Sequence, residues 1–294
     1  MTAAADSDAV LAEACRMVGL DASGAQVVRL GENAIYHLPG GVIARICRAG
    51  QQPAARREVA VSRWLGASGV AAVVALRDIQ QPVEVGDQAV TFWEELPAHQ
   101  QGTPVQVATV LKKLHGLPVP EDVPLGLLHP FVRLSERIQG AAIAADDRAW
   151  LVGQMTRLRE QWSALGPRLP TCVVHGDAWA GNVVATADGR VVLLDLERCS
   201  VGPPEWDLVS TAIKYVTYGG ISQPEYDEFA HCYGRDVAVW EHFELLRDMR
   251  ELRMTCYAAQ HAARGRGYLA EATLRIRCLR GLSGPRPWSW RPVE

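Results

Sequence analysis

Residues 173–195 constrain the fold more than any other part of this sequence. The segment contains an apolar strand, a His-Gly-Asp turn at residues 175–177, and then two short apolar runs separated by Asp188-Gly189. An Asp-Gly pair between two apolar runs is a strong signal for a β-hairpin. Since a hairpin brings its two ends together, Asn182 at its start should lie beside Asp195 at its end.

Three side chains of this segment have the chemistry that phosphoryl transfer requires. Asp177 can position an acceptor hydroxyl and receive its proton. Asn182 and Asp195 offer an amide oxygen and a carboxylate oxygen, which are ligand types that Mg²⁺ prefers. An isolated His-Gly-Asp is usually only a turn, but the whole combination is hard to obtain by chance. We therefore predict that Asp177 is catalytic and that Asn182 and Asp195 are metal ligands.

With these residues in place, the segment resembles the catalytic segment of the aminoglycoside phosphotransferase and choline kinase-like superfamily. The resemblance implies that Asp177 is the catalytic base or orients the hydroxyl, and that Asn182 and Asp195 bind Mg²⁺. The run 202–208 also matches, which implies that Asp207 opens a helix and braces the catalytic loop. From the residues alone, Asp207 can equally be an ordinary carboxylate in the first turn of a helix.

The superfamily implies an α+β, bilobal, protein-kinase-like fold with a small β-rich N-lobe and a larger helical C-lobe. We place the N-lobe at residues 1–96 and the C-lobe at residues 97–294. In this arrangement His175 is expected to hold the loop through hydrogen bonds to the backbone rather than to act as the base.

The predicted N-lobe has the strand and helix patterns that it needs. We expect helices at residues 6–18 and 54–65, and strands at residues 25–30, 34–38 and 42–47. The loop Gly31-Glu32-Asn33 between the first two strands would cover the phosphates of ATP. It contains one glycine, so this assignment depends on its position alone.

A basic residue on the third strand should bind the α- and β-phosphates and pair with a glutamate of the following helix. The chain has three lysines, none of them in the N-terminal third. Arg45 is therefore the candidate, with Glu58 as its partner, because a guanidinium can hold a phosphate and a carboxylate together. Alternatively, Arg45 is a solvated charge at a strand edge, and Glu58 pairs with Arg56 or Arg57 at the surface.

Residues 89–97 form a predicted strand that ends in proline, at the place where a kinase-like fold has its hinge. Backbone groups of Glu95 and Leu96 would bind the edge of adenine, an assignment made by position. Trp93 could line the nucleotide pocket or belong to the core.

The acceptor site is the least defined part. A helix is predicted at residues 237–262, and Asp248 and Glu251 on it could bind a cationic substrate. Arginines alternate with these acids, however, which is typical of a solvated, self-neutralising helix face. The acceptor can be an aminoglycoside, an amino sugar, or a related metabolite or natural product.

Composition excludes several other classes. A net charge of −3 provides no basic field for nucleic acid, and no apolar run reaches the length of a membrane span. The first residues lack a signal-peptide pattern, and seven dispersed cysteines without a Cys-x-x-Cys pair favour reduced thiols in the cytoplasm. No obligate protein partner is evident.

The sequence therefore predicts an ATP- and Mg²⁺-dependent kinase that phosphorylates a hydroxyl of a small molecule. The alternative is a nucleotide-binding pseudokinase that regulates a partner protein, which Arg45 in place of lysine and the glycine-poor loop would support. The three catalytic-loop residues argue against this alternative. A protein Ser/Thr kinase is disfavoured because too few residues separate Asp195 from Trp206 for a peptide-docking loop.

Overall fold

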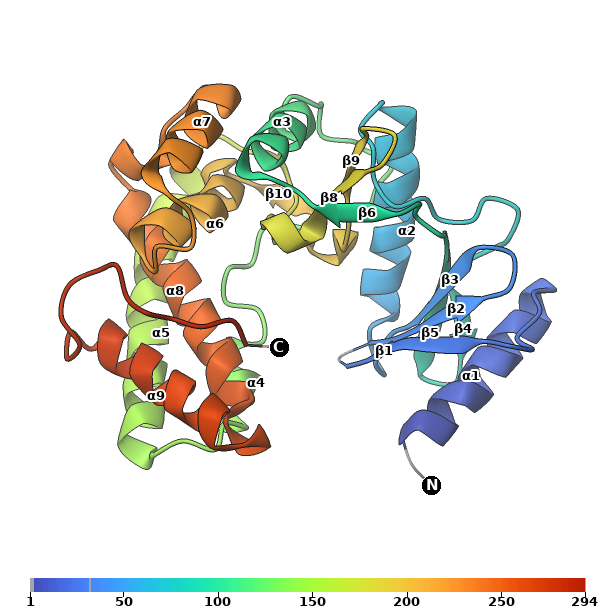
Figure 1. The fold of residues 1–294 in the computed structure, drawn as a ribbon, viewed down its shortest axis with the longest axis horizontal. Helices are drawn as coiled ribbons and strands as arrows, with labels where there is room; N and C mark the ends of the chain where they lie inside the picture. Colours follow the sequence, from blue (N-terminus) through green and yellow to red (C-terminus); the bar gives the residue numbers. More distant parts are fainter. Residues whose placement is uncertain (1–2, 32, 294) are drawn as a thin grey trace. The chain divides into compact units, whose positions relative to one another are not determined.

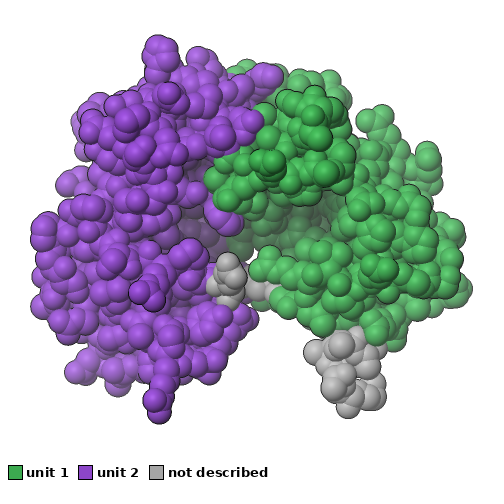
Figure 2. Space-filling view, in the orientation of Figure 1, with its two compact units in different colours: residues 1–102, 116–126, 180–200 green, residues 103–115, 127–179, 201–294 purple. Residues whose placement is uncertain are grey.

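The computed structural model describes residues 3–31 and 33–293, so Glu32 of the predicted phosphate loop lies outside the described residues. The chain forms two compact units, which are described separately (Figure 2). Unit 1 comprises residues 1–102, 116–126 and 180–200, and unit 2 comprises residues 103–115, 127–179 and 201–294. The units thus do not follow a single boundary at residue 96, because the hairpin after Asn182 packs with the N-terminal part of the chain.

Unit 1 is built around an antiparallel sheet with the strand order β1-β2-β3-β5-β4. Helix α1 lies along one face of this sheet (Figure 1). The segment before β4 and helix α2 complete this part of the unit. The bounds are α1 Ala3–Val18, β1 Gln26–Leu30, β2 Ala34–Leu38, β3 Val42–Ile46, α2 Gln52–Ala67, β4 Val83–Val85 and β5 Gln88–Glu94.

The alternation of side chains along β3 and β5 decides which helix each residue meets. Successive residues of a strand point to opposite faces of the sheet. Ala44 and Phe92 are buried in the cluster that contains residues of α1, whereas Ile43 and Trp93 pack with Val59 of α2. Arg45 has the parity of Ile43 and therefore lies on the α2 face of the sheet.

The hairpin predicted around Asp188-Gly189 is present and belongs to a second sheet of unit 1, with the order β6-β8-β9. Val183 of β8 pairs with Leu193 of β9, and the backbone N–H of Gly189 closes the turn by donating to Thr186. The ribbon is tied to the segment after α2, because the N–H of Val73 donates to the carbonyl of Leu193. The bounds are β6 His99–Gln101, β8 Val183–Thr186 and β9 Val191–Leu193.

Unit 2 is mainly helical, and α8 is its central element. Helices α4, α5, α6 and α9 pack against α8 (Figure 1). Apolar residues of α8 at spacings of three and four are fully buried and form this contact. The bounds are α3 Pro104–His115, α4 Leu134–Gln139, α5 Ala145–Leu165, β7 Cys172–Val174, β10 Ser200–Gly202, α6 Glu205–Val216, α7 Gln223–Tyr233, α8 Phe243–Gln260 and α9 Arg266–Leu279.

The structure differs from the predicted elements mainly at α8. A single helix was expected over residues 237–262, but residues 237–239 form a separate 3₁₀ turn and α8 begins at Phe243. The carboxylate of Asp236 accepts a hydrogen bond from the N–H of Ala238, which caps that turn and separates it from α8. Four further three-residue 3₁₀ helices connect other elements: η1 Gly166–Arg168, η2 Ala180–Asn182, η3 Leu196–Arg198 and η5 Ala262–Arg264.

The last described residues dock on unit 2 through their tryptophans. Trp288 and Trp290 are buried, and the guanidinium of Arg275 stacks over the ring of Trp290 at 4.9 Å. The N–H of Trp288 donates to the carbonyl of Thr217 at the end of α6. No helix among residues 3–31 and 33–293 has the length and apolar character needed to cross a bilayer.

Candidate active site

Arg45 is the centre of an ion-pair cluster in unit 1. Its Nη1 donates to Oε1 of Glu58 at 2.5 Å, and its Nη2 donates to Oε2 of Glu197 at 2.6 Å and to Oδ1 of Asp195 at 3.3 Å. The side chains of Arg45 and Glu58 are 13% and 3% exposed. The predicted Arg45–Glu58 pair is therefore formed in the interior, and Arg45 is not a solvated charge at a strand edge.

The ion pairs of this cluster join more carboxylates than guanidinium groups, and a further guanidinium, that of Arg57, donates to the backbone carbonyl of Glu197 at 3.4 Å. Arg198 also pairs with Glu197, at 3.4 Å, so two guanidinium groups face three carboxylates. Burial raises the pKa of Glu58 to about 7. The positive charge of Arg45 lowers this pKa, whereas the negative charges of Asp195 and Glu197 raise it further. The three carboxylates together raise the pKa of Arg45 although burial opposes this. Such a site favours the arrival of a further cation.

Asn182 and Asp195 stand at the two ends of the hairpin, as its pairing requires. The N–H of Leu194 donates to the carbonyl of Asn182 at 2.9 Å. Asp195 has left-handed backbone angles, with φ 53° and ψ 61°, which non-glycine residues seldom adopt. This backbone turn immediately after β9 directs the Asp195 carboxylate to Arg45.

The donor atoms of this cluster fit Mg²⁺. Asp195 and Glu197 provide carboxylate oxygens, and Asn182, whose backbone is bonded to Leu194, carries an amide oxygen at the other end of the hairpin. Over the described residues, no three His, Cys, Asp or Glu side chains form a metal-binding group. A site with one or two carboxylates is nevertheless typical of Mg²⁺ that is bound together with the phosphates of a nucleotide.

Glu197 was missed in the sequence analysis. Its only local signal is its position two residues after the predicted metal ligand Asp195. Its role as a partner of Arg45 depends on a contact across 152 residues of sequence.

The His-Gly-Asp loop of unit 2 is held by its backbone. The carboxylate of Asp207 accepts hydrogen bonds from the N–H of His175 at 2.6 Å and from the N–H of Gly176 at 2.9 Å. The indole N–H of Trp206 donates to the carbonyl of Gly176 at 2.9 Å. Asp207 thus contacts the loop in the way that the family resemblance implies for a bracing residue.

Buried histidines complete this support. His115 Nε2 lies 3.1 Å from Oδ2 of Asp207, and its Nδ1 lies 2.8 Å from the hydroxyl of Tyr233. Burial alone would raise the pKa of Asp207, but the hydrogen bond and charge of His115, with the charges of His175 and Arg250, outweigh burial and lower it. The N–H of Asp177 donates to Nδ1 of the buried His175.

Arg250 is the second residue that the sequence analysis missed. Its Nη1 donates to Oδ1 of Asp177 at 3.3 Å, and its Nη2 donates to the carbonyls of Gly176 and Trp206 at 3.3 and 3.0 Å. The guanidinium stacks 4.1 Å from the ring centroid of Trp206. Burial lowers the pKa of Arg250, with Asp177 and Asp207 opposing this change.

This placement corrects the sequence-based description of the α8 arginines as a solvated face. Arg250 is only 4% exposed. It follows the buried Leu246 by four residues, so it lies on the apolar stripe of α8. This spacing of four residues was the signal in the sequence that could have identified Arg250 as buried.

The two predicted substrate residues of α8 have different surroundings. Asp248 is partly exposed and pairs with Arg247 at 2.9 Å. The Glu251 side chain is 0% exposed and accepts hydrogen bonds from Thr217 at 2.7 Å and from Arg286 at 2.7 and 2.6 Å. Glu251 therefore anchors the C-terminal segment, which corrects its proposed role in binding substrate.

The structure describes both residues of the predicted hinge, Glu95 and Leu96. The N–H of Glu95 donates to the carbonyl of Gly41 at 2.8 Å, and its carboxylate lies 3.0 Å from Nε2 of His37. Leu96 is partly buried. Trp93 is buried, and its indole N–H donates to Thr91 at 2.9 Å, which agrees with the core interpretation. The N–H of Glu95 is thus already used within unit 1.

Of the predicted phosphate loop, Gly31 and Asn33 are described. The N–H of Gly31 donates to the carbonyl of Asn33 at 3.2 Å, so the loop turns tightly between β1 and β2. Gly31 itself is exposed.

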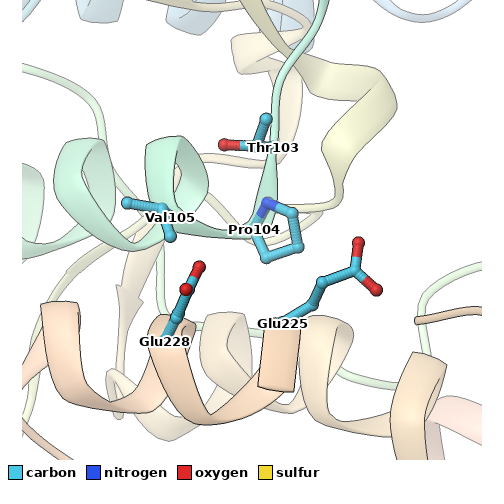
Figure 3. A pocket seen from close by; sticks show the side chains of 5 residues that line it. All are labelled: Thr103, Pro104, Val105, Glu225 and Glu228. Atoms are coloured by element: carbon cyan, nitrogen blue, oxygen red, sulfur yellow. The ribbon is translucent and has the colours of Figure 1, made fainter. Parts of the chain in front are cut away.

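Unit 2 also has a surface pocket that is lined by other residues than those of the predicted site. It has a volume of about 280 Å³ and is lined by the start of α3 and by two glutamates of α7, Glu225 and Glu228 (Figure 3). Glu225 forms a capping box with Ser222. The pocket contains none of the predicted site residues.

Comparisons with known protein families and solved structures find similarity over most of the chain. The model of the phosphotransferase enzyme family matches residues 23–252. No curated protein matches the sequence significantly.

Among solved structures, amicoumacin kinase hAmiN in complex with AMP-PNP, Ca²⁺ and Ami is 14% identical, with a TM-score of 0.73 over 95% of this chain and 96% of that one. A choline/ethanolamine kinase family protein from Mesorhizobium loti is 17% identical, with a TM-score of 0.63 over 94% of both chains. The aminoglycoside phosphotransferase APH(3'')-Id from Streptomyces rimosus is 20% identical, with a TM-score of 0.60 over 83% of this chain and 97% of that one. These similarities confirm the predicted protein-kinase-like fold.

Proposed function

The chain belongs to the phosphotransferase enzyme family, and we propose from this premise that it transfers the γ-phosphate of ATP, with Mg²⁺, to a hydroxyl of a small molecule. The similar solved structures include proteins named as kinases of amicoumacin and of aminoglycosides. An aminoglycoside, an amino sugar, or a related metabolite or natural product therefore remains the proposed acceptor.

The observation that carries this proposal is the exposure of Asp177 on an otherwise buried support. Its side chain is 40% exposed, whereas His175, Asp207 and Arg250 around its loop are buried. A carboxylate that is fixed from behind and open to solvent can align a hydroxyl for attack on phosphorus. We propose that Asp177 orients the acceptor and receives its proton late in the transfer.

Arg250 acts as a positioning residue in this proposal. It contacts Asp177 and also two backbone carbonyls of the supporting structure, so it restricts the orientation of the Asp177 carboxylate. It is buried, so the acceptor is bound by other groups.

The Arg45 cluster would act on the nucleotide. Asn182 and Asp195, with Glu197 beside them, would hold the Mg²⁺, and Arg45 held by Glu58 would steady the phosphates. Bound Mg²⁺ would neutralise charge on the phosphate oxygens. The three carboxylates that pair with Arg45 support a cation at this position.

Asp177→Asn provides the test. We expect kcat to fall by about 10²-fold or more, measured as ADP release in a coupled assay with amino sugars, aminoglycosides, choline-like alcohols and nucleosides. Binding of Mg-AMP-PNP, measured by calorimetry, should remain unchanged. Near wild-type turnover of the variant would contradict the role of Asp177. Tight nucleotide binding by the wild type without transfer to any acceptor would favour the regulatory pseudokinase.

A further inference from the structure

One face of α6 carries both Asp207, which binds the catalytic loop, and Lys214. Asp207, in the first turn of α6, binds the backbone of His175 and Gly176. Lys214 follows Asp207 by seven residues, which is two helical turns or about 10 Å along the same face. Lys214 therefore lies on the side of α6 that faces the catalytic loop.

The partner of Lys214 on that side is Trp179. The ammonium nitrogen of Lys214 is 5.7 Å from the centroid of the Trp179 ring. Trp179 comes two residues after Asp177 and is 44% exposed. A large aromatic surface next to the catalytic carboxylate is thus open to solvent and has a cation at its face.

The ammonium of Lys214 is partly buried without a countercharge. Burial alone lowers its pKa, and no carboxylate among residues 3–31 and 33–293 forms an ion pair with it. Three buried or partly buried arginines of unit 2 do have carboxylate partners, since Arg250 has Asp177, Arg275 has Glu271 at 2.7 Å, and Arg286 has Glu251. Partial burial of an unpaired charge costs free energy that an incoming anion would recover.

We propose that Lys214 and Trp179 form a subsite for an anionic phosphate or carboxylate group beside Asp177. The ammonium pairs with the anion, and the indole ring covers the adjoining carbon skeleton or shields the ion pair from water. The anion comes either from a substituent of the acceptor or from the terminal phosphate of the nucleotide. This assignment of sources rests on the proposed function, and an acceptor source would favour acidic hydroxyl compounds over polycations.

Lysine resonances provide a direct test because the chain contains only Lys112, Lys113 and Lys214. Reductive methylation with ¹³C-formaldehyde preserves the charge and labels each ammonium group. The resonance of Lys214 is identified by its absence in Lys214→Arg and by its displacement in Trp179→Ala, which removes the ring current. Lys113, which is exposed on α3, is the internal control.

Inorganic phosphate is the first probe of the full chain. We expect the Lys214 resonance to shift saturably with phosphate while that of Lys113 shows no saturable shift. A Lys214 shift no larger than that of Lys113 over the whole titration would overturn the subsite, and the lysine would then only pack its stem on Trp179.

Nucleotides distinguish the two sources. The subsite binds the terminal phosphate of the nucleotide if Mg-AMP-PNP shifts the Lys214 resonance and Mg-ADP does not. In that case, phosphate added at saturating Mg-AMP-PNP should cause no further shift. If phosphate still shifts the resonance at saturating Mg-AMP-PNP, the subsite belongs to the acceptor. Either result supports an anion subsite.

Kinetics provide a second, separate readout. With a turned-over acceptor, Lys214→Met should raise the KM of ATP or of the acceptor by about tenfold, according to the source, whereas Lys113→Met should leave both unchanged. The resonance experiment requires no turnover. Failure of the subsite, seen as an unshifted Lys214 resonance, is therefore distinct from failure of the proposed function, seen as absent transfer by the wild type.

Discussion

Arg45 in unit 1 and Arg250 in unit 2 each hold a predicted site carboxylate, but in opposite electrostatic settings. Arg45 is bonded to Glu58, Asp195 and Glu197, and even with Arg198 the carboxylates outnumber the guanidinium groups. Arg250 is bonded to one carboxylate, Asp177, and to two backbone carbonyls. The ion pairs of the first group therefore join three carboxylates to two guanidinium groups, whereas Arg250 has one ion-pair partner and is otherwise bonded to backbone carbonyls.

This difference indicates what each group still lacks. A cluster with surplus negative charge is completed by a cation, which agrees with the proposed Mg²⁺ of the nucleotide. A single ion pair that is also bonded to the backbone instead fixes geometry. Substitutions at three positions can break or sharpen this contrast.

Asp195→Asn should produce the largest effect. We expect the affinity for Mg-AMP-PNP to fall by about 100-fold, because a charged ligand of the proposed metal is lost while Arg45 remains. Calorimetry with and without Mg²⁺ measures this change, and the loss should be confined to the Mg²⁺-dependent part. Asp188→Asn in the turn of the same hairpin is the matched control, since Asp188 is exposed and pairs with Arg190. Unchanged Mg-nucleotide affinity in Asp195→Asn would remove it from the metal site.

Arg250→Met should have a smaller effect on activity, and of a different kind. We expect kcat to fall by about 10- to 100-fold with little change in nucleotide affinity, because Asp177 loses its orientation. The carbonyls of Gly176 and Trp206 lose a buried donor, so the free energy of unfolding should fall by about 1–3 kcal/mol.

Arg250→Lys separates positioning from general destabilisation. Lysine retains the charge but cannot bridge Asp177 and the backbone with a planar fork. We expect Arg250→Lys to be closer to the wild type in stability than in kcat, compared with Arg250→Met. Arg253→Met, which removes a neighbouring arginine bonded to the carbonyl of Pro130, is the control on the same helix. Equal loss of kcat in the two Met variants would argue against a specific role for Arg250.

At Glu58 we expect an effect on stability that depends on pH. Its pKa is raised from 4.5 to about 7 in the folded protein, so the folded state binds this proton more tightly than the unfolded state does. The contribution of Glu58 to stability should therefore decrease as the pH rises from 4.5 to about 7, by an amount on the order of 2–3 kcal/mol. Denaturant unfolding without nucleotide at pH 5 and pH 7.5 measures it.

In Glu58→Gln this part of the pH dependence should disappear. Glu84→Gln is the matched control, because Glu84 also pairs with an arginine, Arg56, but at the surface. Mg-AMP-PNP should reduce the loss at pH 7.5 in the wild type by supplying the missing positive charge. Identical pH profiles of the wild type and Glu58→Gln would contradict the raised pKa of Glu58 in the folded protein.

Much of the fold and part of the site could be predicted from local patterns. The Asp188-Gly189 turn and the apolar runs beside it specified the hairpin that brings Asn182 next to the residue before Asp195. Strand alternation placed Arg45 on the face that α2 covers, so the Arg45–Glu58 pair followed from two short elements. The family resemblance came from the same few residues, and the family match confirms it.

Other features could not be predicted in this way. Asp248 and Glu251 are equivalent in sequence pattern, yet Glu251 is buried by Thr217 and Arg286 while Asp248 is partly exposed. Periodicity describes a helix but does not specify which neighbour covers each of its faces.

The sequence by itself determined the hairpin, the strand faces and the family, because turn preferences and side-chain alternation act over a few residues. Only the tertiary structure decided that Glu197 meets Arg45 across 152 residues and that Arg250 meets Asp177 across 73. Such contacts depend on how whole elements pack, and the charge balance of a site is the sum of these contacts rather than a property of any one segment.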